Sequence, residues 1–296
     1  MTEAPKRQAG FSDYLELTKP RLSLLSVLTA LVGYFSARPS GGSAKIGFLV
    51  VGTSLAAGGV ASLNQWMESD TDAQMHRTAL RPIPTGKIAG GSAFVLGWLM
   101  CIAALMIIFS LVGKLAALFT LLTIAFYLGW YTPAKRTSYW STEIGAVAGA
   151  FPPLIGWTAA EGSVTALGWI LFGILFFWQI PHFMAIAWTY RKDYSAVHFP
   201  MLPVRDASGA KVAGWSLAAT LALVAVSLLP VALGLASAAY GVGAALAGFL
   251  FIWRAFGFLK ASERDSGARR LFFFSLAYLP VLLGMLVADR LLSHHP

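Results

Sequence analysis

Charged side chains are scarce in this sequence. Lys, Arg, Asp and Glu make up 12% of its 296 residues, about half of the roughly 25% that soluble domains carry. This shortage excludes the broad basic surface that binds nucleic acid, so we expect no nucleic-acid partner, although the formal net charge is +9. The chain has one cysteine, Cys101, which excludes an internal disulfide and is expected to be a packing residue.

Long apolar runs take the place of the missing charge. Hydrophobic residues make up 57% of the chain, and a membrane-spanning helix needs roughly 20 predominantly apolar residues. The predicted spans are 22–37, 46–66, 91–112, 115–131, 142–160, 164–189, 213–236, 238–256 and 271–288. Because the runs are continuously apolar rather than alternating, they indicate helices and not a β-barrel. We predict an all-α integral membrane protein in which residues 1–296 form a single transmembrane domain that contacts the lipid bilayer.

Basic residues are distributed unevenly between the two faces of this predicted bundle. The N-terminal segment 1–21 and every second loop carry nearly all of them, and the other face has only Arg38, Lys45, Lys114 and Arg290 of the 22 Lys and Arg. By the positive-inside rule the rich face is cytoplasmic, with the C-terminus outside. The segment 1–21 contains acids and lacks an apolar core with a cleavage site. We therefore expect no secretory or transit signal, and a multi-pass protein of the bacterial plasma (inner) membrane.

Oxygen ligands recur at helical spacing where the second predicted span ends. Asn64, Glu68 and Asp72 are four residues apart, so on an α-helix they share one face over two turns. Two carboxylates and an amide are hard oxygen donors that suit Mg²⁺, especially when substrate phosphates complete its coordination. The alternative is an ordinary solvated helix end, and Asp70, which points elsewhere, is expected to be solvated. Acids also line transporter pathways, but there they usually lie at mid-membrane between repeated broken helices.

Cations and prolines follow these acids in the stretch HRTALRPIPTGK. Arg77 and Arg81 come soon after Asp72, and Pro82 and Pro84 end any continuing helix. Metal-binding acids beside cations suit a diphosphate, because the metal bridges the phosphates while the cations neutralise the remaining charge. The alternative is that the cations only contribute to the positive-inside asymmetry.

The order of these motifs resembles a known family. NxxxExxxD followed by RTxxRPxP is similar to the first aspartate-rich motif of the UbiA-type intramembrane prenyltransferases. The segments LTKPRLSLLSVLTALVGY, YTPAKR, GAVAGAFPPLIGW and WQIPHFMAIAWTYRKDYSAVHFPMLPV resemble the branch of that family that modifies haem. The resemblance covers residues 13 to about 205, and the last three spans match only in hydropathy.

The resemblance implies both a fold and a reaction. The fold is a bundle of nine transmembrane helices around a central cavity open to the cytoplasmic face. The substrates are farnesyl diphosphate and haem B, and the cofactor is Mg²⁺. The farnesyl group joins a vinyl group of haem B with addition of water, giving haem O and diphosphate, and a haem A synthase is a candidate partner that receives the product. The alternative is a UbiA-type enzyme whose acceptor is an aromatic quinone precursor.

YTPAKR supplies candidate groups for the leaving diphosphate. Lys135 and Arg136 are predicted, with Arg77 and Arg81, to take up the negative charge that develops as the C–O bond breaks. Tyr131 is predicted to donate a hydrogen bond to the same group; the alternative is a tyrosine anchor at the membrane interface.

WTYRKDYSAVHF occupies the place of the second aspartate-rich motif. Relatives with aromatic acceptors have DxxxD there, whereas this chain offers a single acid, Asp193, so the existence of a second full metal site stays open. Asp193 is predicted to be a catalytic residue and a metal ligand together with the first motif, and its alternative is an ion pair with Arg191 or Lys192. Tyr190, Arg191, Lys192 and His198 are predicted to bind substrate.

WQIPHF places two further polar residues deep in an apolar run. His182 is predicted to bind haem, either through the iron or through a propionate. Its alternative is a neutral histidine bonded to a neighbouring helix, since Pro181 leaves a carbonyl without its helical partner. Gln179 is predicted to face the same cavity.

Overall fold

The computed structural model describes residues 9–39 and 43–292, and within these ranges every regular element is a helix. The predicted all-α membrane protein is therefore confirmed. Of the predicted N-terminal segment 1–21, residues 1–8 lie outside the described part of the chain, and so do residues 293–296 at the C-terminus.

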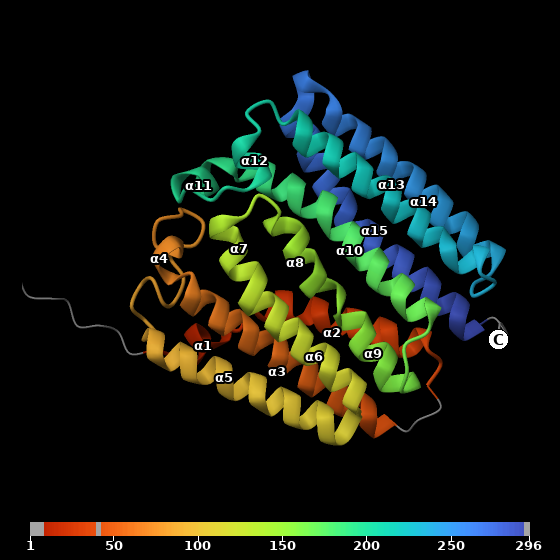
Figure 1. Cartoon of the computed structure of the whole chain (residues 1–296), viewed down its shortest axis with the longest axis horizontal. Helices are drawn as coiled ribbons and strands as arrows, with labels where there is room; N and C mark the ends of the chain where they lie inside the picture. Colours follow the sequence, from red (N-terminus) through yellow and green to blue (C-terminus); the bar gives the residue numbers. More distant parts are fainter. Residues whose placement is uncertain (1–8, 40–42, 293–296) are drawn as a thin grey trace, which may run out of the picture.

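The helices follow one another along the chain, and the longest described connection, residues 73–89, joins α4 to α5 (Figure 1). In chain order they are α1 (Phe11–Leu17), α2 (Pro20–Ser36), α3 (Ser43–Met67), α4 (Ser69–Asp72), α5 (Gly90–Ile107), η1 (Ile108–Val112), α6 (Lys114–Ala125), η2 (Phe126–Tyr131), α7 (Thr132–Thr137), α8 (Ser141–Ala150), α9 (Pro152–Glu161), α10 (Ala166–Thr189), α11 (Arg191–Ala196), α12 (Leu202–Arg205), α13 (Ala210–Ala232), α14 (Ala238–Leu259), η3 (Ala261–Glu263) and α15 (Arg264–Leu292). Each of the nine predicted spans falls on one or more of these helices.

Seven stretches of the described residues are long and apolar enough to cross a membrane. They are Ala44–Met67, Gly90–Val112, Lys114–Thr137, Ala166–Thr189, Ala210–Ala232, Ala238–Leu259 and Ala261–Leu292. The first predicted span corresponds to α2, which has 17 residues, and the fifth to the pair α8 and α9. A count of nine spanning helices thus stays a prediction.

The fifth predicted span is broken at Phe151, where α8 ends and α9 begins. Pro152 and Pro153 follow directly, and a proline removes the backbone N–H that an unbroken helix needs and clashes with the preceding turn. The redirected α9 packs closely on α2. A Cβ added at Gly33 would overlap the Pro153 carbonyl, and one at Gly156 would overlap that of Ala30, so glycine is required at both points of this crossing.

Two groups of helices diverge toward the end of the molecule where α4 and α11 lie (Figure 1). One group contains α3, α5 and α6, and the other contains α10, α13, α14 and α15, with α7 and α8 between them. The largest apolar core lies within the second group and includes Leu171, Phe251 and Leu282. This arrangement brings the loops that follow α3 and α10 to the same end of the bundle.

Candidate active site

The predicted oxygen ligands lie buried at the end of α3. Asn64 is on the last turns of α3, Glu68 caps α4, and Asp72 is the last residue of α4. Their exposed fractions are 1%, 5% and 0%. A solvated helix end would leave these side chains in water, so this alternative is wrong. Acids buried to this degree need cations or a metal, because desolvation strongly disfavours an unpaired carboxylate.

Two of the predicted cations contact the two acids. The Lys135 ammonium of α7 donates to Glu68 Oε1 at 2.7 Å, and the Arg81 guanidinium donates to Asp72 Oδ2 at 2.5 Å. The Lys135 ammonium also lies 4.5 Å from the centre of the Tyr131 ring, within the range of a cation–π interaction. The structure thus brings predicted site residues together around the acidic pair from α4, η2, α7 and the loop before α5.

Lys19 is a third cation at this cluster, and it was not among the predicted site residues. Its ammonium donates to Asn64 Oδ1 at 3.4 Å. Gln65 donates to the Leu17 carbonyl at 2.7 Å and so docks the corner between α1 and α2 onto the end of α3. Burial lowers the pKa of Lys19 to about 7, and the nearby charges of Arg81 and Lys135 contribute to this lowering. An anion bound beside Lys19 would therefore strongly stabilise the charged form of its ammonium group.

Lys19 also has an unusual backbone conformation that marks its position. Its φ of 48° lies in the left-handed region, which is unfavourable for a residue other than glycine. The following Pro20 begins α2. In the sequence, the only mark of Lys19 is its position directly before Pro20, which the structure places at the corner between α1 and α2.

The donor set fits a Mg²⁺ ion. Asp72 Oδ1 is buried and has no hydrogen-bond partner, although Asp72 Oδ2 is taken by Arg81. Together with the Glu68 carboxylate and Asn64 Oδ1 it provides the oxygen ligands that Mg²⁺ prefers. Within the described ranges no three His, Cys, Asp or Glu side chains converge, so Asp193 stands apart from this pair.

Arg136 lies outside the buried cluster, although it was predicted beside Lys135. Its guanidinium donates two hydrogen bonds to the Asp70 carboxylate, at 2.8 and 2.5 Å, and a third to the Met67 carbonyl at 3.0 Å. The bonds from Arg136 lower the pKa of Asp70, and the Asp70 side chain is largely exposed, as predicted. Two successive residues of α7 thus bind different acids: Lys135 binds the buried Glu68, and Arg136 binds the exposed Asp70.

Arg77 bridges the two loops at the α4–α11 end instead of contacting the acids. Its guanidinium donates to the Tyr194 hydroxyl at 3.1 Å and lies 5.2 Å from the centre of the Tyr190 ring. Met75 and Phe199 belong to a small apolar cluster that joins the same two loops. This bridge, which we call the Arg77 clasp, consists of Arg77, Tyr190 and Tyr194.

The remaining residues of the second motif point in different directions. Arg191 turns away toward α15: it donates to the Trp188 carbonyl at 2.7 Å, stacks on the Trp188 ring at 4.1 Å and lies 3.3 Å from Asp265. Lys192 and His198 are exposed. Asp193 is half-buried, and among the described residues it forms no ion pair with Arg191 or Lys192.

His182 packs against α15. Its Nδ1 is 2.7 Å from Ser275 Oγ, and its ring stacks on Trp178 with centres 4.6 Å apart. This is the geometry of the alternative in which the histidine bonds to a neighbouring helix. Gln179 faces the opposite neighbour, α8, and donates to the Ala146 carbonyl at 3.1 Å. The structure therefore places neither side chain in contact with the acidic pair.

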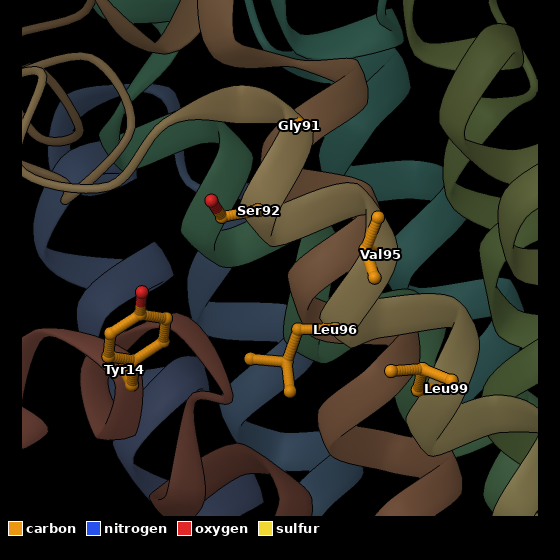
Figure 2. Close-up of a pocket in the computed structure, with 6 residues that line it drawn as sticks. All are labelled: Tyr14, Gly91, Ser92, Val95, Leu96 and Leu99. Atoms are coloured by element: carbon orange, nitrogen blue, oxygen red, sulfur yellow. The ribbon is translucent and has the colours of Figure 1, made fainter.

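An apolar groove of about 570 Å³ lies elsewhere, between α1 and α5 (Figure 2). Tyr14 forms one wall, and Ser92, Val95, Leu96 and Leu99 line the helix opposite. These residues are separate from the predicted site, and their apolar character is that of a lipid-facing surface.

The chain is similar to known proteins over almost its whole length. The model of the UbiA prenyltransferase family matches residues 26–277. A protoheme IX farnesyltransferase of Opitutus terrae is 68% identical over 291 residues, which cover 98% of this chain and 99% of that protein. The protein of the same name from Solibacter usitatus is 40% identical and covers 94% of this chain and 98% of its own length.

Solved structures share the fold at much lower sequence identity. The digeranylgeranylglyceryl phosphate synthase structure has a TM-score of 0.80 at 17% identity and covers 94% of this chain and 98% of its own. A UbiA homolog from Archaeoglobus fulgidus bound to GPP and Mg²⁺ has a TM-score of 0.68 at 12% identity, with 90% and 99% covered. At these identities the likeness concerns the fold alone.

Proposed function

The chain belongs to the UbiA prenyltransferase family, and we propose that the buried cluster at the end of α3 binds the diphosphate of its prenyl substrate. The reaction follows from membership of the haem-modifying branch, to which the relatives at 68% and 40% identity belong. The enzyme transfers the farnesyl group of farnesyl diphosphate to a vinyl group of haem B with addition of water, and it gives haem O and diphosphate.

Asn64, Glu68 and Asp72 would hold Mg²⁺ through Asn64 Oδ1 and the carboxylate oxygens. A metal bound there supplies positive charge to the diphosphate oxygens and stabilises them as the leaving group departs. The observation that carries this assignment is Asp72 Oδ1, a buried carboxylate oxygen without a hydrogen-bond partner in a cluster of two ion-paired acids, Glu68 and Asp72 itself. Such an oxygen is costly unless a cation completes its surroundings.

The diphosphate oxygens that the metal does not bind would accept hydrogen bonds from Lys135, Arg81 and Lys19. All three ammonium or guanidinium groups already lie at the cluster, so a diphosphate placed between them meets donors from three parts of the chain. As the C–O bond of the substrate breaks, its electron pair stays on the diphosphate, and prearranged cations stabilise that charge without reorganising.

The farnesyl carbon left by diphosphate is an allylic cation. The π electrons of the haem vinyl group form the new C–C bond, which moves the positive charge to the vinyl carbon next to the porphyrin. A water molecule adds to that carbon and loses a proton, which yields the hydroxyl of haem O. Tyr127 and Tyr131, whose rings meet edge to face 5.0 Å apart beside Lys135, would offer π surface near the cation.

The substrates would also contact residues outside the buried cluster. Asp193, on α11 across from α4, would add a ligand to the metal–diphosphate complex when substrate binds, and Tyr190 with the exposed Lys192 and His198 would meet the substrates at the α4–α11 end. That end would face the cytoplasm of a bacterium, in the plasma membrane. A haem A synthase would receive the product.

Purified protein incubated with farnesyl diphosphate and haem B, followed by chromatographic separation of the haems, tests the site. We expect Glu68→Gln and Asp72→Asn each to lower the rate of haem O formation by about 100-fold or more, because each removes a charge next to the leaving group. The matched control is Asp70→Asn, which changes an exposed acid in the same short helix and should keep most of the activity. Full turnover in Asp72→Asn would refute the metal assignment.

A further inference from the structure

Thr132 lies directly behind the amide of Asn64. It is 2% exposed, and it is the first residue of α7. Its hydroxyl oxygen accepts from Asn64 Nδ2 at 3.2 Å, and the hydroxyl itself donates to the Tyr127 carbonyl at 2.9 Å. The threonine therefore joins a residue of the acidic cluster to the backbone of another helix.

The two bonds of this hydroxyl are not interchangeable. A threonine hydroxyl has a single proton to donate, and here the Tyr127 carbonyl receives it, since a carbonyl only accepts. Toward Asn64 the hydroxyl must then act as an acceptor, and only the NH₂ end of the amide can serve it. The opposite end, Asn64 Oδ1, consequently faces the Lys19 ammonium. One proton thus decides which way the amide is turned.

The π-helical segment η2 places the Tyr127 carbonyl where it can receive that proton. In an α-helix a threonine hydroxyl bonds to the carbonyl four residues earlier, whereas here the partner is five residues earlier. The backbone N–H of Thr132 also donates to the Tyr127 carbonyl, which is the hydrogen-bond pattern of a π-helix. The wider turn thereby aims Thr132 at Asn64.

We propose that Thr132 is a positioning residue that fixes the amide of Asn64 with its oxygen toward the metal. The inference rests on the proposed function, in which Asn64 Oδ1 is a metal ligand. An amide turned by 180° would present NH₂ to the cation and lose the ligand, and groups that orient metal ligands typically change metal affinity by about 10- to 100-fold.

Binding of Mn²⁺ as a substitute for Mg²⁺, followed by electron paramagnetic resonance on the purified full-length protein with inorganic diphosphate, tests this. Thr132→Val keeps the shape of the side chain but removes the hydroxyl, and we expect it to weaken Mn²⁺ binding about 10-fold. Thr132→Ser retains the hydroxyl and should bind Mn²⁺ within about 2-fold of the unaltered protein. Equal binding by the valine and serine variants would overturn the inference.

A second pair of variants separates orientation from packing. In Asn64→Asp both ends of the side chain are oxygens, so turning it changes nothing for the metal. We therefore expect Thr132→Val to alter Mn²⁺ binding by less than about 2-fold when it is added to Asn64→Asp, against about 10-fold when it is made alone. An equal loss in both cases would show that Thr132 only supports the fold, and it would refute the positioning role.

Asn64→Ala distinguishes this inference from the proposed function. If that variant binds Mn²⁺ as the unaltered protein does, Asn64 is no ligand, and the metal assignment fails together with the inference. If Asn64→Ala binds weakly while Thr132→Val binds normally, only the inference fails. Should the valine variant not yield folded protein, Thr132→Ala, made alone and together with Asn64→Asp, provides the same comparison.

Discussion

Lys19 offers a test of the cluster at the scale of a single residue. Its ammonium lies 3.4 Å from Asn64 Oδ1, and burial lowers its pKa to about 7. Lys19→Met removes one of three cations for the diphosphate, so we expect the KM for farnesyl diphosphate to rise about 10-fold, with a smaller change in kcat. The matched control is Arg21→Met, which removes an exposed cation two residues away and should leave the KM within about 2-fold. Equal KM values for the two variants would remove Lys19 from the site.

The residues of the acidic cluster were predictable to the extent that local spacing determines them. Asn64, Glu68 and Asp72 were expected on one helical face because they are four residues apart, and the structure keeps them together although α3 ends at Met67 and Asp72 belongs to α4. Partners that are distant in sequence were not predictable. Thr132 is 68 positions from Asn64, and adjacent residues of one motif, Lys135 and Arg136, bind different acids. Which side of α7 meets α3 depends on how the helices pack, and the spacing of residues along the chain does not give that packing.

η2 supplies a prediction at the scale of an element. One residue in an α-helix corresponds to about 100° of rotation, so deleting Gly129 would remove the wide turn and rotate Thr132 and Lys135 relative to α6. We expect the deletion to lower the rate of haem O formation by at least about 100-fold, while the protein still elutes as a folded species in detergent. The control is Gly129→Ala. A Cβ there meets open space, so activity should persist, and the helix should gain up to about 1 kcal/mol. Normal activity in the deletion variant would show that the register of α7 does not matter.

The long helices were predictable as elements because each belongs to an apolar run, but the short helices at the α4–α11 end and the irregularities of the long ones were less so. The break at Phe151 has a sequence signal in Pro152 and Pro153, which the apolar count from 142 to 160 overlooked. The π-helical segments η1 and η2 have no comparable signal. Their wide turns depend on tertiary contacts with neighbouring helices and side chains, and the local sequence does not show those contacts.

At the scale of the whole molecule, the two diverging groups of helices end in loops that meet at the α4–α11 end (Figure 1). Composition predicted the membrane fold, because half the usual charge and long apolar runs allow little else. The resemblance placed both motifs at this end. The sequence did not indicate the Arg77 clasp. An arginine that follows an acidic motif was expected at the diphosphate. Its contacts with Tyr194 and Tyr190 instead tie one group of helices to the other.

The clasp leads to a prediction that separates these two roles of Arg77. If Arg77 joins the loops, Tyr194→Phe removes the same hydrogen bond from the other side, and the double variant Arg77→Leu with Tyr194→Phe should be little worse than Arg77→Leu alone. We expect Arg77→Leu to raise the KM for farnesyl diphosphate by roughly 3- to 10-fold and to speed hydrogen exchange in both residues 73–89 and 190–205, because the loops lose their connection. The opposite result would be that the effects of the two substitutions on KM multiply fully and that exchange becomes faster in residues 73–89 only. That result would place Arg77 on the diphosphate, as its position in the sequence first indicated.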